Sequence, residues 1–119
     1  MQKSDAYRAA EAVVRSLGVT CANLSVRQLI CGLELLHTDE SLIVNVTKRL
    51  YPMIAERYPS SSKASVERNL RTARDAIVER GDRERLEEVL GHKLRYSLSV
   101  ADLLDSLDYY LRRNGLWPD

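Results

Sequence analysis

Seven lysine and arginine residues but only two acidic residues lie between positions 48 and 74, which gives this window a net charge of +5. Residues 1–47 carry a net charge of −1 and residues 75–119 a net charge of −3, so the whole chain is nearly neutral at +1. The planar guanidinium of arginine can bond bidentately to guanine O6 and N7 or to a phosphate. A basic patch in an otherwise neutral domain indicates a face that binds a polyanion.

Periodic apolar residues predict that much of this charge lies on one long helix. The helix is expected to run from Lys63 to Arg80, with Gly81 as its stop. On a helical wheel its apolar residues share a narrow arc, and its charged residues lie on the side away from that arc. The apolar set is Val66, Leu70, Ala73 and Ile77, and the charged set is Glu67, Arg68, Arg71, Arg74 and Asp75.

A second helix is expected before it, from about Glu40 to about Tyr58, capped by Thr38 or Asp39. Its apolar stripe continues past Pro52, which favours one kinked helix over a break at the proline. That stripe comprises Leu42, Val46, Leu50 and Met53.

The two helices are joined by the turn Pro59-Ser60-Ser61-Ser62, so that residues 42–80 together are predicted to form a helix-turn-helix. The first turns of the second helix are the ones that a recognition helix inserts into the major groove of DNA. Glu67 can accept a hydrogen bond from cytosine N4 or hold Arg68 in register. The free serine hydroxyls, with Lys63, suit phosphate contacts at the helix N-terminus.

The remaining segments predict four more helices, which makes a single all-α domain of about six helices over residues 1–119. A capping box of Ser25 and Gln28 is expected to open the helix that ends near Leu36. Of the other three helices, the first is capped by Ser4 and ends near Leu17, and the second is capped by Asp82 and ends near Leu90. The third is capped by Ser97 or Ser99 and ends near Asn114.

A plainer interpretation of the charged helix face competes with DNA binding. Exposed arginines on a helix usually mark a solvated surface, and Glu67 with Arg71 would form an ordinary i,i+4 ion pair. Charge and periodicity alone favour DNA binding only slightly.

Several short segments, found in a fixed order, resemble the C-terminal effector domain of the stage 0 sporulation protein A family. This family comprises the response regulators that initiate endospore formation, and the similarity is densest over residues 42–91. The segments are Leu50-Tyr51-Pro52, Ile54-Ala55, the polar turn, Val66-Glu67-Arg68, Leu70-Arg71, Ala73 and Arg80-Gly81.

The resemblance implies a six-helix fold whose third and fourth helices form the helix-turn-helix. It also implies binding to double-stranded DNA at short repeated promoter boxes, with two domains in tandem as a homodimer on DNA. Glu67 and Arg68 match the base-contacting pair of the family, and Arg71 matches a further contact, either in the groove or with a phosphate. The expected phosphate contacts are Lys48, Arg49, Ser60, Ser61, Ser62, Lys63 and Arg74.

The chain also departs from the family pattern. Thr72 replaces a histidine, Arg74 an apolar residue, and Ile77-Val78 an Ala-Trp pair, which leaves the target sequence open. No receiver domain is present in these 119 residues. An alternative function is a degenerate effector-like module that binds a full-length regulator and modulates it without contacting DNA itself.

Other functional classes find little support in the sequence. The two histidines lie in no catalytic motif, so an enzyme is not expected. Cys31 and His37 lack third and fourth metal ligands at usable spacing, and no cofactor or small-molecule substrate is expected. The apolar runs are too short for a membrane span, and no secretory signal is present, so the cytoplasm is the expected location.

Overall fold

The computed structural model describes residues 3–118, and all regular elements within that range are helical. This confirms the predicted all-α class with six α-helices. A 3-10 helix, η1, and a short π-helical segment, η2, lie between the second and third of them. The elements are α1 (Asp5–Ser16), α2 (Leu24–Thr38), η1 (Glu40–Asn45), η2 (Val46–Leu50), α3 (Tyr51–Arg57), α4 (Lys63–Arg80), α5 (Arg83–Leu90) and α6 (Val100–Arg113).

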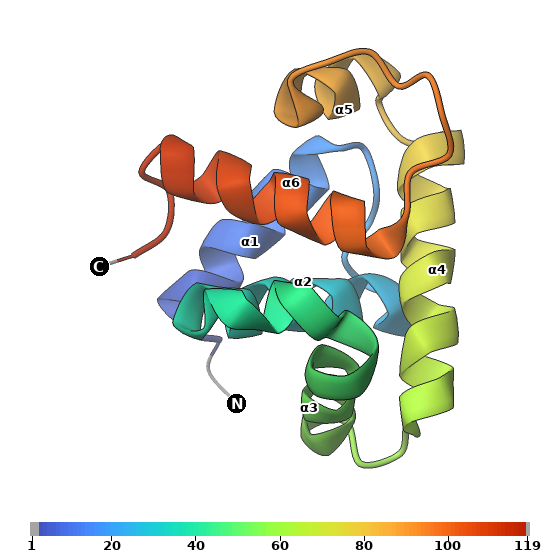
Figure 1. The fold of residues 1–119 in the computed structure, drawn as a ribbon. Helices are drawn as coiled ribbons and strands as arrows, with labels where there is room; N and C mark the ends of the chain where they lie inside the picture. Colours follow the sequence, from blue (N-terminus) through green and yellow to red (C-terminus); the bar gives the residue numbers. More distant parts are fainter. Residues whose placement is uncertain (1–2, 119) are drawn as a thin grey trace.

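Helix α2 forms the centre of the core, because nine of its fifteen residues are buried. Helices α1, α4 and α6 pack around it, and α3 crosses near the base of α4 (Figure 1). Burial of this apolar surface is the main stabilising contribution to the fold. The arrangement leaves α4 at one edge of the molecule, with one side against the core and the other toward solvent.

Three of the predicted helix caps, those of α1, α5 and α6, are confirmed, and Ser62 caps α4 although the sequence analysis assigned it only to the turn. The side chains of Ser4, Ser62, Asp82 and Ser99 accept a hydrogen bond from the backbone N–H three residues later, as N-caps of α1, α4, α5 and α6. The predicted bounds of α4, Lys63 to Arg80, are also confirmed.

The capping box predicted for α2 is wrong. Asn23 caps this helix, and its Oδ1 accepts from the backbone N–H of Val26 at 2.9 Å. A capping box would require the side chain of Gln28 to reach back along the helix surface. Gln28 instead points into the core, where it is completely buried.

The single kinked helix predicted from Glu40 to Tyr58 is also wrong, because the chain breaks before the proline. Asn45 leaves the helical region, with φ −147° and ψ 74°, and its side chain accepts from Lys48 N–H. From Val46 to Arg57 the helical backbone is continuous and passes through Pro52. The wider turn of η2 just before Pro52 suits a residue that has no N–H and whose ring would crowd a tighter turn.

The turn after α1 contacts the turn between α4 and α5, and this contact fixes the C-terminal end of α4. The backbone N–H of Asp82 donates to the carbonyl oxygen of Leu17 at 2.7 Å. A Cβ added to Gly81 would lie 2.5 Å from the same oxygen and 2.4 Å from that of Ile77, so only glycine fits this crossing. The α4–α5 turn is therefore anchored to the end of α1.

Within residues 3–118, no helix is both long enough and apolar enough to cross a membrane.

Candidate nucleic-acid interface

Helices α3 and α4 form a helix-turn-helix, with residues 58–62 as the turn. Backbone bonds shape the turn: Tyr58 N–H donates to Ala55 O at 3.1 Å, and Ser61 N–H donates to Tyr58 O at 2.8 Å. Ser62 Oγ then accepts from Ser65 N–H at 3.1 Å, which starts α4. The second helix of the motif is thus positioned by its own cap and by the turn before it.

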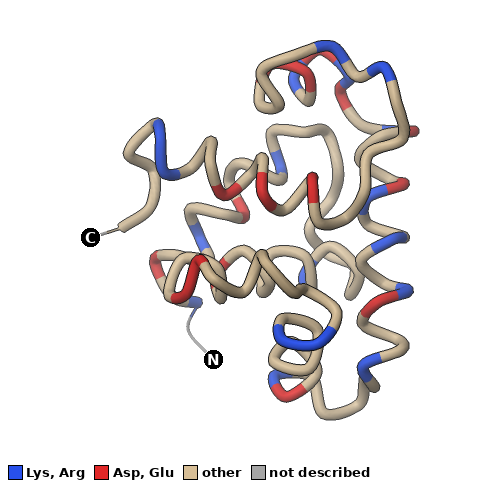
Figure 2. Tube along the Cα trace, in the orientation of Figure 1, with Lys and Arg blue, Asp and Glu red and all other residues tan. Residues whose placement is uncertain are grey.

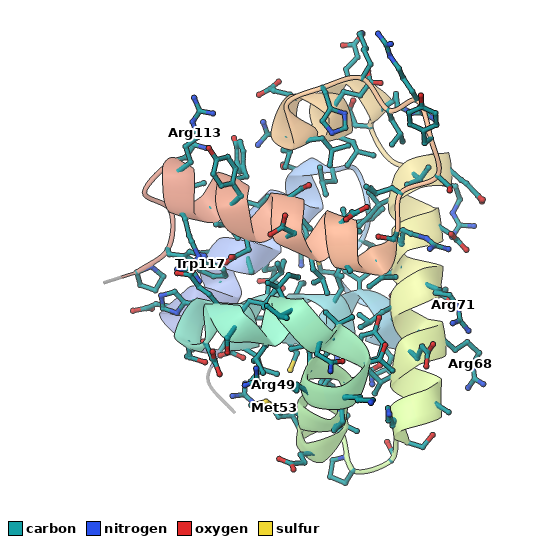
Figure 3. All side chains as sticks on the ribbon, viewed as in Figure 1. Arg49, Met53, Arg68, Arg71, Arg113 and Trp117 are labelled. Atoms are coloured by element: carbon teal, nitrogen blue, oxygen red, sulfur yellow. The ribbon has the colours of Figure 1, made fainter. Side chains whose placement is uncertain are left out.

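The inner face of α4 is locked into the core, as the sequence predicted. Val66, Leu70, Ala73 and Ile77 are completely buried. Their burial orients the helix and turns its opposite side to solvent (Figure 3, where the labelled Arg68 and Arg71 project outward from α4).

The charge on the exposed side of α4 is unevenly distributed along its length. Basic positions predominate in the N-terminal half, whereas Asp75 and Glu79 follow in the C-terminal half (Figure 2). The positive end of the helix dipole adds to the basic half. The arrangement creates an anion-attracting surface over the first three turns of α4.

The three predicted base-contacting residues differ in how they are held. Arg71 Nη1 lies 3.3 Å from Glu67 Oε1, which makes the i,i+4 ion pair that the plainer interpretation expected. Glu67 therefore pairs with Arg71, and the expectation that it holds Arg68 is not met. Within the described range, the guanidinium of Arg68 has neither an ion pair nor a hydrogen bond, and it is exposed.

Two of the predicted phosphate contacts on α4 are also in place on its exposed side. Lys63, the first residue of the helix, is exposed and unpaired within the described range. Arg74 is drawn toward its neighbour, since its Nε and Nη2 donate to Asp75 Oδ1 at 3.0 and 2.9 Å. The side chain of Arg74 is only 25% exposed, compared with 52% for Arg71. Arg74 is therefore less available to a ligand than Arg71.

The serine hydroxyls of the turn are not all free, contrary to expectation. Ser61 Oγ accepts from Gln28 Nε2 at 3.0 Å, and Ser62 Oγ caps α4. Ser60 is exposed and forms no side-chain hydrogen bond within residues 3–118. Ser61 Oγ acts only as an acceptor and still carries a hydrogen to donate, whereas Ser62 Oγ also donates its hydrogen to Ser65 Oγ at 3.2 Å.

Lys48 and Arg49 lie on η2, before α3. Arg49 bends back toward the start of η1, where its guanidinium contacts Ser41 and lies 3.4 Å from Asp39 Oδ2. The hydroxyl of Ser41, and to a smaller degree Arg49, holds the pKa of Asp39 below its usual value. Figure 3 places Arg49 beside Met53, on the side of α3 away from Arg68 and Arg71. The structure therefore does not bring Arg49 together with the α4 residues.

Two residues at this site were missed by the sequence analysis. Tyr51 is almost fully buried, and burial, followed by the nearby charge of Glu67, raises the pKa of its hydroxyl. The charges of Arg71 and Arg74 act on this pKa in the opposite direction. Gln28 contacts both the turn and α4. Its spacing from the buried Cys31 and Leu35, at i+3 and i+7, was the available signal that it faces inward.

Other kinds of site are not apparent in the part of the chain that the structure describes. No three histidine, cysteine or acidic side chains gather there to hold a metal ion. Cys21 and Cys31 are buried free thiols, and burial raises the pKa of Cys31 to about 11, which keeps it protonated and unreactive.

The fold and this surface define a helix-turn-helix domain whose second helix has an exposed basic face. Residues 10–101 match the family described as sporulation initiation factor Spo0A C terminal. Because the match covers most of the chain, the chain belongs to this family of DNA-binding regulator domains, which is not a family of enzymes. A comparison with curated proteins gave no match.

Proposed function

We propose that this domain is a sequence-specific transcriptional regulator that inserts α4 into the major groove of double-stranded DNA. The observation that carries the proposal is the exposed guanidinium of Arg68 on the N-terminal half of α4, which has no partner among residues 3–118. An unpaired arginine needs no internal bond broken before it bonds to guanine O6 and N7. The buried face of α4 supplies the rigid support that such a contact requires.

Glu67 and Arg71 complete the proposed base-contacting set. In the free protein they satisfy each other at 3.3 Å, with both side chains partly exposed. An exposed pair of this kind is worth little, so bases in the groove can displace it at small cost. Arg71 would then face a guanine or a phosphate, while Glu67 would accept a hydrogen bond from cytosine N4.

The proposed phosphate contacts surround this set. Lys63 and Ser60 lie at the N-terminus of α4 with no competing side-chain partner in the described part of the chain, and the dipole of α4 favours an anion there. Ser61 keeps a hydroxyl hydrogen to donate, and Ser62 would join only after releasing its bond to Ser65 Oγ. Lys48 is exposed on η2. Arg49 and Arg74 would join only after leaving their contacts with Asp39 and Asp75.

We further propose that two copies bind in tandem to repeated boxes, as the family resemblance implies. Titration of a labelled two-box duplex, compared with a one-box duplex, measures the stoichiometry. Two domains per duplex with tighter binding to the second box support the tandem arrangement, and independent binding to each box contradicts it.

Selection of bound oligonucleotides from a random pool tests the function directly. The expected outcome is a short enriched motif whose binding weakens steeply with salt, by about 0.9 in log K per log unit of salt for each phosphate contacted. Binding without enrichment of any motif, or no binding at low salt, would refute sequence-specific recognition. Co-purification of a full-length regulator together with absent DNA binding would favour the modulating module instead.

A further inference from the structure

We propose that Gln28 is a positioning residue that fixes the turn and the recognition helix in the orientation needed for selective DNA binding. This inference rests on the proposed function. Gln28 is the only polar side chain that is fully buried within residues 3–118, and it lies on the central helix α2. A buried amide costs free energy unless its hydrogen bonds are made, so its partners deserve an explanation.

Both partners of Gln28 belong to the helix-turn-helix. Gln28 Nε2 donates to Ser61 Oγ in the turn at 3.0 Å, and Gln28 Oε1 accepts from Asn69 Nδ2 on α4 at 3.0 Å. These partners are 33 and 41 residues away in the chain. One side chain on the core helix therefore ties down the turn and the recognition helix at once.

The bond to Asn69 restrains the rotation of α4 about its own axis. Asn69 lies directly after Arg68 in the sequence, and a small rotation of the helix would swing Arg68 and Arg71 across the groove. The burial of Val66 and Leu70 keeps this face of α4 in the core, but the hydrophobic effect itself has no preferred direction. A hydrogen bond depends steeply on its angle, so it specifies one orientation.

The bond to Ser61 gives its hydroxyl a direction. Because Ser61 Oγ accepts from Gln28 on the inner side, its hydrogen is directed elsewhere. Ser61 is partly exposed, so this hydrogen can be donated to a phosphate outside the turn. Gln28 would thus set both a phosphate donor and the angle of the base-contacting helix.

Stability alone does not account for a glutamine at this position. Replacing both partners of a buried hydrogen bond with apolar groups of similar shape is often neutral for stability. What the amide adds is a directional constraint between α2, the turn and α4. Removing the amide should therefore lower the selectivity of DNA binding without a matching loss of stability.

The variants Gln28→Met and Gln28→Met/Asn69→Leu test this, with Val14→Ala as the control. Val14 is fully buried on α1, a helix outside the helix-turn-helix, so its truncation destabilises the core by leaving a cavity. All proteins are compared where circular dichroism shows them folded. The two readouts are amide hydrogen exchange over residues 58–66 and the ratio of affinities for selected and random DNA.

Gln28→Met and the double variant are expected to speed exchange in the turn about tenfold and to lower the affinity ratio about tenfold, with binding to random DNA nearly unchanged. Val14→Ala should change neither readout beyond its effect on global stability. Wild-type exchange and a wild-type ratio in folded Gln28→Met would overturn the proposal. So would an equal change in both readouts for Val14→Ala.

Two further outcomes are also decisive. If Gln28→Met does not fold, Asn69→Ala removes the α4 partner from a partly exposed position, and an unchanged affinity ratio for that variant overturns the proposal. If the wild-type protein selects no DNA sequence, the proposed function fails. In that case hydrogen exchange alone tests the role of Gln28. Faster exchange in the turn of Gln28→Met but not of Val14→Ala supports its positioning role, and unchanged exchange in Gln28→Met refutes it.

Discussion

Arg71 and Glu67 form an ion pair on the exposed face of α4, with Nη1 and Oε1 3.3 Å apart, and both belong to the proposed base-contacting set. The free domain therefore holds two of its candidate contacts against each other and leaves Arg68 open. This relationship makes the contributions of the three residues separable by mutation.

Glu67→Gln removes the ion pair and keeps the size of the side chain. Because both partners are partly exposed, the free energy of unfolding should fall by less than about 1 kcal/mol in urea denaturation. Random DNA should bind slightly more tightly, since one negative charge leaves the interface. The preference at one base pair of the selected site should change, and an unaltered preference at every position would exclude Glu67 from base contact.

Arg68→Ala and Lys63→Ala should differ in kind. Arg68→Ala is expected to lower affinity for the selected site by roughly 1–3 kcal/mol and to flatten discrimination between sites. Lys63→Ala should weaken all sequences about equally and reduce the salt slope by about 1. Binding assays on the selected site and on single-base variants, at two salt concentrations, measure both effects. Unchanged target preference in Arg68→Ala would show that Arg68 contacts no base.

The sequence predicted α4 well because every signal for this helix is local. Gly81 ends it, and its four core residues follow the helical period, while the Ser62 cap, which the sequence analysis did not assign, is also local. The ion pair of Glu67 with Arg71 was equally predictable from i,i+4 spacing. Charge periodicity also identified which side of α4 faces solvent.

The features that the sequence did not predict depend either on partners far away in the chain or on a choice between two equally suitable residues. Gln28 finds its hydrogen bonds 33 and 41 residues away, which no local pattern encodes. Asn45 breaks the helix before Pro52 because its side chain competes for a backbone N–H, although the proline was the stronger local signal. Asn23 and Ser25 are both good caps, and only the inward position of Gln28 decides between them.

The choice of cap for α2 gives a stability test. Asn23→Ala should lower the free energy of unfolding by about 1 kcal/mol, because Val26 N–H loses its acceptor. Ser25→Ala, two residues later, should have an effect below about 0.5 kcal/mol. Urea denaturation of both variants measures the difference. A larger loss of stability in Ser25→Ala than in Asn23→Ala would support the capping box instead.

The loop after α5 should loosen in acid. Glu87 Oε2 accepts from Leu94 N–H at 2.7 Å, and this bond, with the charge of Lys93, holds the pKa of Glu87 below its usual value. A lowered pKa means that the carboxylate stabilises the fold above its ordinary value of 4.5 and that this contribution is lost as the pH falls through the lower folded value.

The expected result is faster hydrogen exchange at Leu94 as the pH falls through the lowered pKa of Glu87, below 4.5, after correction for intrinsic rates. Glu87→Gln should show faster exchange than the wild type at neutral pH and little further acid response. Glu84→Gln, on the exposed side of the same helix, is the matched control and should behave like the wild type. An acid response retained in Glu87→Gln would assign the loosening to another group.

Gly81→Ala tests the joint that anchors the end of α4. A Cβ at this position would lie 2.4 Å from Ile77 O and 2.5 Å from Leu17 O, and neither backbone atom can move without disturbing its helix. The free energy of unfolding should fall by about 3 kcal/mol, as expected for overpacking. Gly91→Ala is the control, because Gly91 has φ +84° and no atom near its missing Cβ, so only backbone strain of about 1 kcal/mol is expected. Because the joint lies at the far end of α4 from Arg68, folded Gly81→Ala should keep its DNA preference. Equal losses of stability in the two variants would contradict the close crossing of the two turns.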